Sequence, residues 1–238
     1  MTNRNGLEGR GTALASWDGT VLVAIDGTES RKMQHSSVRA FYEGYTGAKR
    51  YFHGPNRWVT GADLWPTVER ATQFVLWNRR SLGARDSIDL VGHSRGGMGV
   101  IVVAQRLHDQ PGGAIPVRFM GLFDAVDRTP TLEFGRIPSN VGVVSHAVRD
   151  PRVGSRSYFG NTGLHHASGV RYRRHIFPGS HSGLGGDPWR GDHPHGLTET
   201  ADIKAAEGAY SWIVDRARNA GVPVRKLIVT FAAYRVSR

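Results

Sequence analysis

The chain has 238 residues, of which 39% are hydrophobic, so it suits one globular domain and is too short for two full-sized ones. It contains no cysteine, which excludes disulfides, thiol catalysis, zinc fingers and iron–sulfur centres. The formal net charge is +11, mostly from arginine, and such a surface attracts anions of any kind.

No segment reaches the roughly 18 consecutive apolar residues of a membrane span, and residues 1–17 lack the apolar core of a signal peptide. We therefore expect a soluble protein that stays in the cytoplasm or is exported without a cleaved signal peptide. The basic residues in 149–174 and 216–238 lack the interleaved aromatic residues of known nucleic-acid readers, so no specific nucleic-acid partner is expected. The simplest interpretation of the charge is a solvated, arginine-rich surface.

Short apolar runs predict the strands of one sheet, at residues 20–25, 50–53, 87–91, 117–123, 141–147 and 171–177. Helices are predicted at 61–77, 96–107 and 199–218, the first and last from apolar residues that recur every three or four positions. Residues 222–234 look like a further strand that the pattern does not place. Strands that alternate with helices predict an α/β domain with a mainly parallel sheet and helices on both faces.

The predicted single domain takes in residues 1–238, with its core at about 20–220. Its longest connection, 149–170, is rich in Gly, Ser and Arg and is longer than most loops of a compact domain. We interpret it as a lid over the site, with plain disorder as the equal alternative. Ligands bind beyond the carboxyl ends of parallel strands, so functional residues are expected directly after the predicted strands.

A candidate nucleophile follows the third predicted strand. Residues 92–96 read Gly-His-Ser-Arg-Gly, which matches G-x-S-x-G between a strand and a helix. In a nucleophile elbow the glycines permit a sharp turn, the hydroxyl of Ser94 is held above the sheet, and the N–H of Arg95 faces the developing oxyanion. The second oxyanion donor is expected from Gly27 or Thr28, after the first strand. The alternative is a serine in a glycine-rich turn that binds an anion.

A serine hydroxyl needs a histidine base, and the histidine needs a carboxylate that fixes its tautomer. On this kind of fold the chain order is serine, acid, histidine. Asp124 follows the fourth predicted strand and is the predicted acid, with Asp127 and Asp150 as alternatives. His181, in the glycine-rich loop 178–186, is the predicted base. The weaker candidates for the base are His93, His146, His165, His166, His193 and His195.

The loop that follows His181 offers two interpretations, a metal site and a solvated polar loop. Asp187, His193 and His195 could together approach a divalent metal there. Their spacing matches no established ligand motif, so a solvated polar loop is favoured. We predict no metal and no cofactor.

The motif residues, taken in chain order, resemble a bacterial α/β-hydrolase family that includes the phospholipase effectors of type VI secretion. The matching segments are residues 26–28, 51–54, 92–97, 121–126, 146–147 with Asp150 and Arg152, and 177–186. The resemblance implies a three-layer α/β-hydrolase-like sandwich, a triad of Ser94, Asp124 and His181, and hydrolysis of ester bonds, in some members those of phospholipids. The chain departs from the family pattern at two positions. Ala125 stands where the family usually has Thr, directly after the acid, and Pro151 stands where it usually has Glu, directly after Asp150.

The predicted function is therefore a serine hydrolase of carboxylic esters, with a small ester or a phospholipid as substrate. The charge favours contact with an anionic membrane surface. The family's secreted phospholipases, however, carry a membrane-anchoring region for which 238 residues leave no room. The alternative, from a different functional class, is a non-catalytic module on the same fold that binds anions or a membrane surface.

Overall fold

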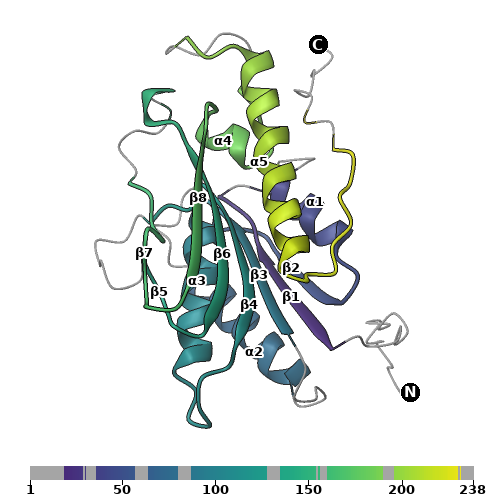
Figure 1. Ribbon diagram of the computed structural model, residues 1–238, viewed down its shortest axis with the longest axis vertical. Helices are drawn as coiled ribbons and strands as arrows, with labels where there is room; N and C mark the ends of the chain where they lie inside the picture. The colour runs from purple at the N-terminus through teal and green to yellow at the C-terminus, as the bar shows by residue number, and fades with distance from the viewer. Residues whose placement is uncertain are drawn as a thin grey trace, which may run out of the picture.

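The structure is a computed structural model that describes residues 19–28, 30, 36–56, 64–79, 87–127, 135–153, 155, 160–189, 196–229 and 231. A six-stranded sheet runs through this part of the chain, in the order β2-β1-β3-β4-β6-β8 (Figure 1). Its strands are β1 (Thr20–Ile25), β2 (Ala48–Phe52), β3 (Ser87–His93), β4 (Val117–Phe123), β6 (Val141–Arg149) and β8 (Arg171–Phe177). Every neighbouring pair is parallel, which confirms the predicted fold class.

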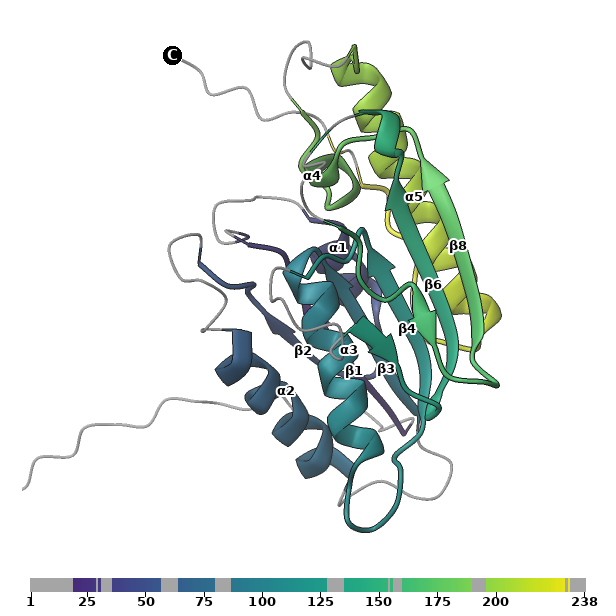
Figure 2. The ribbon, with the colours of Figure 1, turned by 90° about the vertical axis from the view of Figure 1, so that its left-hand side faces the viewer.

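Helices cover both faces of the sheet, so the domain has the three layers that the sequence predicts (Figure 2). The helices are α1 (Ser37–Gly44), α2 (Leu64–Arg79), α3 (Arg95–His108), the short α4 (His181–Leu184) and α5 (Glu199–Asn219). α2 and α3 pack on one face, and α1 and α5 on the other. Within the described ranges, none of these helices combines the length and the apolar content needed to cross a membrane.

The apolar run of β1 shows why both faces need a cover. All six of its residues are buried. Val21 and Val23 face the core under α2 and α3, whereas Leu22 and Ala24 face the core under α1 and α5, because successive residues of a strand point to opposite faces. A strand that is apolar on both faces is stable only where helices exclude water from both.

Most of the predicted elements are confirmed to within a few residues. The strands predicted at 117–123 and 171–177 have these bounds in the structure, and the helix predicted at 199–218 ends one residue later. Elements that the sequence analysis did not predict are α1, α4, the short strand pair β5 (Arg136–Ile137) and β7 (His165–His166), and a 3-10 helix at Pro151–Val153.

The strand predicted over residues 222–234 is wrong for the described residues of that segment. Val224 forms an isolated antiparallel bridge with Tyr45, and Pro223 has no N–H to contribute to a ladder. The side chains of Val222, Val224 and Phe231 are buried in the core under α1 and α5. The alternation of apolar residues here reflects packing against helices rather than a place in the sheet.

The predicted lid, 149–170, falls partly outside the described residues, which omit 154 and 156–159. Its described part carries a 3-10 helix and β7, which pairs with β5. The N–H of Thr162 donates to the carbonyl oxygen of Ala125 over 3.0 Å. This stretch therefore packs against the residues that follow β4.

Because all six strands of the sheet are parallel, their carboxyl ends lie along one edge of the sheet. Polar side chains follow several of these ends. Asp26 comes after β1, Ser94 after β3, Asp124 after β4, and His181 shortly after β8. The topology thus gathers residues from four distant parts of the chain at one edge.

Candidate active site

Ser94 sits in a tight turn between β3 and α3. Its backbone has φ 55° and ψ −128°, a conformation that strains any residue with a side chain. A Cβ on Gly92 would lie 2.5 Å from the carbonyl oxygen of Gly96, and a Cβ on Gly96 would overlap that of Ile25. Glycine at both positions lets α3 begin this close to β1 and β3. The turn has the geometry of a nucleophile elbow.

His181 lies within hydrogen-bond distance of both Ser94 and Asp124. Its Nε2 is 2.8 Å from Oγ of Ser94, and its Nδ1 is 2.6 Å from Oδ2 of Asp124. An ionised carboxylate can only accept, so the ring proton is assigned to Nδ1, and Nε2 accepts from the serine hydroxyl. All three residues are buried. The structure thus joins the predicted nucleophile, base and acid in one hydrogen-bonded chain.

Asp124 accepts four hydrogen bonds directly after β4. Its Oδ1 accepts from the backbone N–H of Arg149 over 3.1 Å and from Nδ2 of Asn161 over 2.7 Å. Its Oδ2 accepts from Nη1 of Arg149 over 2.5 Å and from His181. Asp124 has φ 43°. Among the described residues other than glycine, only Asp124 and Ser94 have a positive φ. Strained backbone of this kind is typical of functional sites.

The pKa of Asp124 lies well below its ordinary value of 3.8. Burial by itself would raise this pKa, but the hydrogen bond from His181 and the electrostatic interactions with His181 and Arg149 outweigh it. Asp124 is therefore an anion throughout the neutral pH range. That is the form that can orient a histidine and stabilise its protonated ring.

Asp202, in the first turn of α5, holds the segment that carries His181. Its carboxylate is fully buried and accepts from the N–H and the hydroxyl of Ser180 and from the N–H of Trp189, each over 2.6 Å. Asp202 was not predicted as a site residue. The signal was its position four residues before Ala206, on the buried stripe of the predicted helix, because a carboxylate there must have partners.

The two residues predicted as sources of the second oxyanion donor, Gly27 and Thr28, both lie in the turn after β1. The N–H of Gly27 donates to Oδ1 of Asp26 over 2.7 Å and is already engaged. Nε of Arg95 donates to Oγ1 of Thr28 over 2.8 Å, which ties the turn after β1 to the first residue of α3. The amides of Arg95 and Thr28 are therefore the candidate donors for an oxyanion.

Asp26 organises the turn after β1. Its Oδ2 accepts from the hydroxyl of Tyr51 over 2.6 Å and from that of Ser36, while Oδ1 accepts from Gly27. Burial raises the pKa of Asp26 above its ordinary value, and these hydrogen bonds offset only part of the rise. The side chain of Asp26 thus holds the conformation of the turn in which the candidate oxyanion donor lies.

Neither alternative acid takes the position beside the histidine. Asp150 accepts from Nη2 of Arg152 over 2.6 Å and from its backbone N–H over 2.9 Å. Nδ1 of His181 is engaged by Asp124, so Asp127 and Asp150 do not occupy that place. The structure therefore groups Asp124, and not its rivals, with Ser94 and His181.

Two other histidines lie near the site in different roles. His146 is fully buried, accepts from the N–H of Ala125 over 3.2 Å, and has its pKa lowered to about 4 by burial. It is therefore a neutral group beneath the turn after β4. The ring of His93 lies 5.0 Å from that of His181, and its Nε2 lies 3.2 Å from the carbonyl oxygen of His181. His93 thus packs against the candidate base.

The remaining histidines are remote or undescribed. His165 and His166 are exposed on β7. His193 and His195, which the sequence analysis grouped with Asp187, lie outside the described residues. Within the part of the chain that the structure describes, no group of three or more His, Cys, Asp or Glu residues could hold a metal ion.

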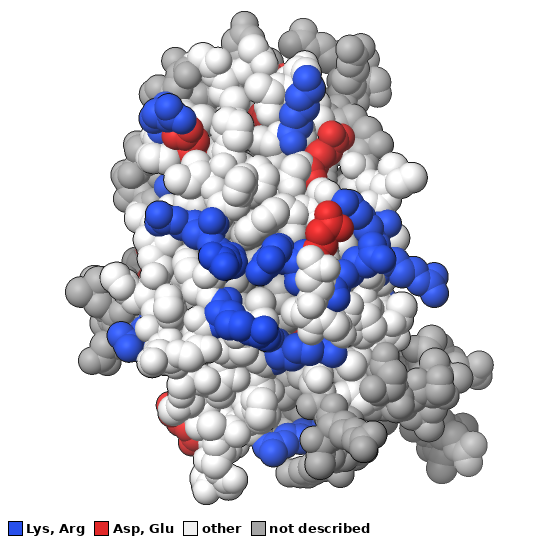
Figure 3. All heavy atoms as spheres, in the orientation of Figure 1, with Lys and Arg blue, Asp and Glu red and all other residues white. Residues whose placement is uncertain are grey.

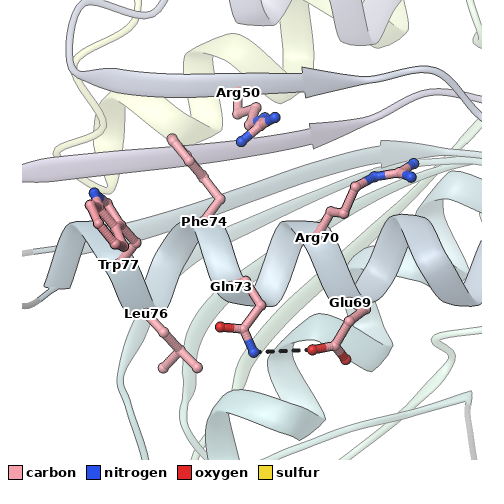
Figure 4. A pocket seen from close by; sticks show the side chains of 7 residues that line it. All are labelled: Arg50, Glu69, Arg70, Gln73, Phe74, Leu76 and Trp77. Carbon is pink, nitrogen blue, oxygen red and sulfur yellow. Dashed lines mark hydrogen bonds between the residues drawn. The ribbon is translucent and has the colours of Figure 1, made fainter.

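A hollow of about 470 Å³ lies between β2 and α2 (Figure 4). It is lined by Arg50, Glu69, Arg70, Gln73, Phe74, Leu76 and Trp77. None of these is a predicted site residue, and all but Arg50 belong to α2. The hollow therefore belongs to the surface of α2 at the β2 edge of the sheet and not to the candidate site.

Comparison with protein-family models and with curated proteins gives no match. Among solved structures, an uncharacterized protein from Pseudomonas aeruginosa is similar with a TM-score of 0.53 and 14% identity, over 90% of this chain and 49% of that one. This chain thus spans about half the length of that protein. The metagenomic carboxyl esterase MGS0156 matches with a TM-score of 0.48 and 11% identity, over 93% and 81% of the two chains.

The thioesterase RedJ, from the prodiginine biosynthetic pathway of Streptomyces coelicolor, matches with a TM-score of 0.42 and 16% identity, over 75% of this chain and 86% of that one. At identities this low, structural likeness concerns the fold and not the reaction. The three-layer architecture predicted from the sequence, a mainly parallel sheet with helices on both faces, is confirmed.

Proposed function

We propose that this protein is a serine hydrolase that cleaves carboxylic esters through an acyl-enzyme. The observation that carries the proposal is the hydrogen-bonded chain from Asp124 through His181 to Ser94, with the serine on a strained elbow at the carboxyl edge of the sheet. A hydroxyl, an imidazole and a carboxylate in this order are what nucleophilic catalysis by serine requires.

In the proposed reaction, Oγ of Ser94 attacks the ester carbonyl while Nε2 of His181 takes the hydroxyl proton. Asp124 keeps the imidazole in the tautomer that can accept this proton and stabilises the ring once it is charged. The amides of Arg95 and Thr28 donate to the oxyanion of the tetrahedral intermediate. His181 then returns the proton to the leaving alcohol, which leaves Ser94 acylated. A water molecule, activated by the same histidine, releases the acid and restores the serine.

Turnover of p-nitrophenyl butyrate tests the proposal. The wild type is expected to release p-nitrophenol catalytically, and Ser94→Ala and His181→Ala are each expected to lower kcat/KM by about 10⁴-fold or more, since members of a triad act as a unit. His166→Ala, in an exposed histidine on β7, is the matched control and should retain activity. Equal turnover by wild type and Ser94→Ala would contradict the proposal.

Within this proposal, the substrate is a phospholipid acyl ester or a small soluble ester. Figure 3 shows Lys and Arg side chains crossing the face formed by β8 and α5. We call five exposed residues of this face the basic belt: Arg171, Arg173, Arg218, Arg225 and Lys226. Anionic lipid headgroups complement such a surface, which favours the phospholipid. The motif resemblance to the phospholipase effectors of type VI secretion points to the same substrate class.

Vesicle hydrolysis separates these two substrates. If the substrate is a phospholipid, fatty acid should be released faster from phosphatidylglycerol vesicles than from phosphatidylcholine vesicles, and the difference should shrink as salt rises. If the substrate is a small ester, p-nitrophenyl butyrate should be turned over while both kinds of vesicle stay intact. Ser94→Ala is the inactive control in both assays.

The basic belt also favours a second candidate function, a non-catalytic module that binds an anionic surface. Under this function the wild type binds phosphatidylglycerol vesicles in a salt-dependent way, and Ser94→Ala binds equally well. It further requires that the wild type hydrolyses no ester. Catalytic turnover that depends on Ser94 would therefore rule it out as the sole function.

A further inference from the structure

We propose that Arg149 is a positioning residue of the proposed triad, which holds the carboxylate of Asp124 ionised and turned so that Oδ2 faces His181. The inference rests on the proposed function, because it assigns a role within the same site. It goes beyond the three triad members by adding a buried cation that acts through the acid rather than on the substrate.

The sheet places Arg149 beside Asp124. Arg149 is the last residue of β6, which pairs with β4. Phe123 is paired with Ala147 in these strands, so Arg149 lies just beyond the end of β4. The N–H of Asp124 donates to the carbonyl oxygen of Ala147 over 2.7 Å, which fixes the two strand ends relative to each other. The side chain of Arg149 is only 6% exposed and lies against the carboxylate.

Two hydrogen bonds from Arg149 fix the plane of this carboxylate. Its backbone N–H donates to Oδ1 over 3.1 Å and its Nη1 to Oδ2 over 2.5 Å. Bonds to both oxygens from one residue resist rotation about the Cβ–Cγ bond of Asp124. Nδ2 of Asn161 takes a second position on Oδ1. The carboxylate has about four lone-pair positions, so the one left on Oδ2 is filled by Nδ1 of His181.

Arg149 also brings the positive charge that a buried carboxylate needs in the resting site. Asp124 has no exposure to water, and a buried carboxylate without a cation tends to take up a proton. Protonated, it would lose the charge that stabilises the imidazolium formed during attack by Ser94. Asn161 is neutral and cannot supply this charge, whereas a guanidinium stays charged at any working pH.

Kinetics with p-nitrophenyl butyrate and a double-mutant cycle test the proposal. Arg149→Met is expected to lower kcat by roughly 10- to 100-fold with KM within about twofold, since Arg149 acts through Asp124 and does not touch the substrate. Arg149→Lys should recover most of the loss, because it restores the positive charge, whereas the backbone N–H that donates to Oδ1 is kept by both variants. In the background of Asp124→Asn, Arg149→Met should cause little further loss, because the group through which it acts is gone.

Two variants serve as controls. Arg152→Met makes the same chemical change three residues along the chain, at an 88% exposed side chain bonded to Asp150, and should keep wild-type kinetics. Asn161→Ala removes a neutral hydrogen bond from Oδ1 without removing charge, and should cost less than Arg149→Met. Circular dichroism and thermal unfolding establish that each variant is folded.

The outcomes separate this inference from the proposed function. A wild type that turns over no ester and takes up no active-serine probe would overturn both. If the wild type is active, the inference alone is overturned by either of two results. Arg149→Met keeps full kcat, or it lowers kcat by the same factor in the Asp124→Asn background as in the wild type. If Arg149→Met does not fold, Arg149→Lys decides: activity near wild type supports the role of charge, and a loss as large as that of Asp124→Asn overturns it.

Discussion

Two strained turns are held in place by the sheet next to them. The N–H of Ser94 donates to the carbonyl oxygen of Phe123 over 3.1 Å, and that of Asp124 to Ala147 over 2.7 Å. Each strand end is thus fixed to its neighbour. An unfavourable backbone conformation of this kind costs about 1–3 kcal/mol, which the packed sheet offsets. The nucleophile and the acid are therefore held in place before any substrate arrives.

A substitution that relieves the backbone strain at residue 94 should raise the free energy of unfolding. Ser94→Gly is expected to raise the free energy of unfolding by about 0.5–1 kcal/mol, because glycine tolerates a positive φ that strains serine, while ester hydrolysis is lost. Ser211→Gly, inside α5, is the matched control and should lower it by a similar amount. Urea denaturation of both variants checks this, and a Ser94→Gly variant no more stable than Ser211→Gly would contradict it.

The carboxyl group of Asp26 should make stability fall as pH rises. Its pKa is raised in the folded protein above the ordinary value of 3.8, so the folded state keeps this proton to higher pH than the unfolded state does. The contribution is fully present below the unfolded pKa and is lost as pH rises through the folded pKa. Asp26→Asn should therefore give a flatter plot of unfolding free energy against pH above about 4. An unchanged slope in urea titrations would refute this.

At the scale of elements, α5 holds the segment of the candidate base through the buried carboxylate of Asp202. Asp202→Ala should lower the free energy of unfolding by about 2–4 kcal/mol, because three donors from Ser180 and Trp189 lose their acceptor. It should also slow ester turnover, since His181 directly follows Ser180. Glu207→Ala, on the exposed face of the same helix, is the control for both measurements. Turnover as fast as in the wild type would separate Asp202 from the site.

The central strands and the long helices could be predicted from sequence because their patterns are local. The apolar run of β1 and the three-to-four spacing along α5 each reflect burial by a single element. The segment after α5 was predicted wrongly because Val222 and Val224 alternate like a strand while packing on helices. Nothing within that segment distinguishes the two, since the difference lies in which element covers it.

In the candidate site, too, local sequence patterns predict some residues, whereas the partners of others depend on the tertiary fold. Ser94, Asp124 and His181 could be proposed because each follows a predicted strand and the motif G-x-S-x-G specifies a strand-to-helix turn. Arg149 and Asp202 could not be assigned partners from the sequence. Arg149 meets Asp124 only because β6 lies beside β4, and Asp202 meets the base segment only because α5 packs over it.

At the scale of the whole molecule, the basic belt and the candidate site occupy different places. The belt crosses the face of β8 and α5, whereas the site lies at the carboxyl edge of the strands (Figures 1 and 3). The charge can therefore draw the molecule to an anionic surface without forming part of the reaction. Surface binding and ester chemistry should be separable by substitution.

The double variant Arg171→Glu/Arg173→Glu should weaken binding to phosphatidylglycerol vesicles roughly 10-fold or more, at about 1 kcal/mol for each basic residue near the surface. Its turnover of p-nitrophenyl butyrate should stay unchanged. Arg50→Glu/Arg70→Glu makes the same charge change at the β2 edge and should affect vesicle binding much less. Equal losses from both pairs in a sedimentation assay would mean that net charge, and not the belt, governs binding.

The most direct test of the central claim is the mass of the intact protein after treatment with a fluorophosphonate, followed by peptide mapping. We predict one adduct per chain, on Ser94, formed readily by the wild type, slowly by His181→Ala and not at all by Ser94→Ala. An unmodified wild type, or an adduct mapped to any other residue, would mean that hydroxyl, imidazole and carboxylate meet in this fold without making a nucleophile.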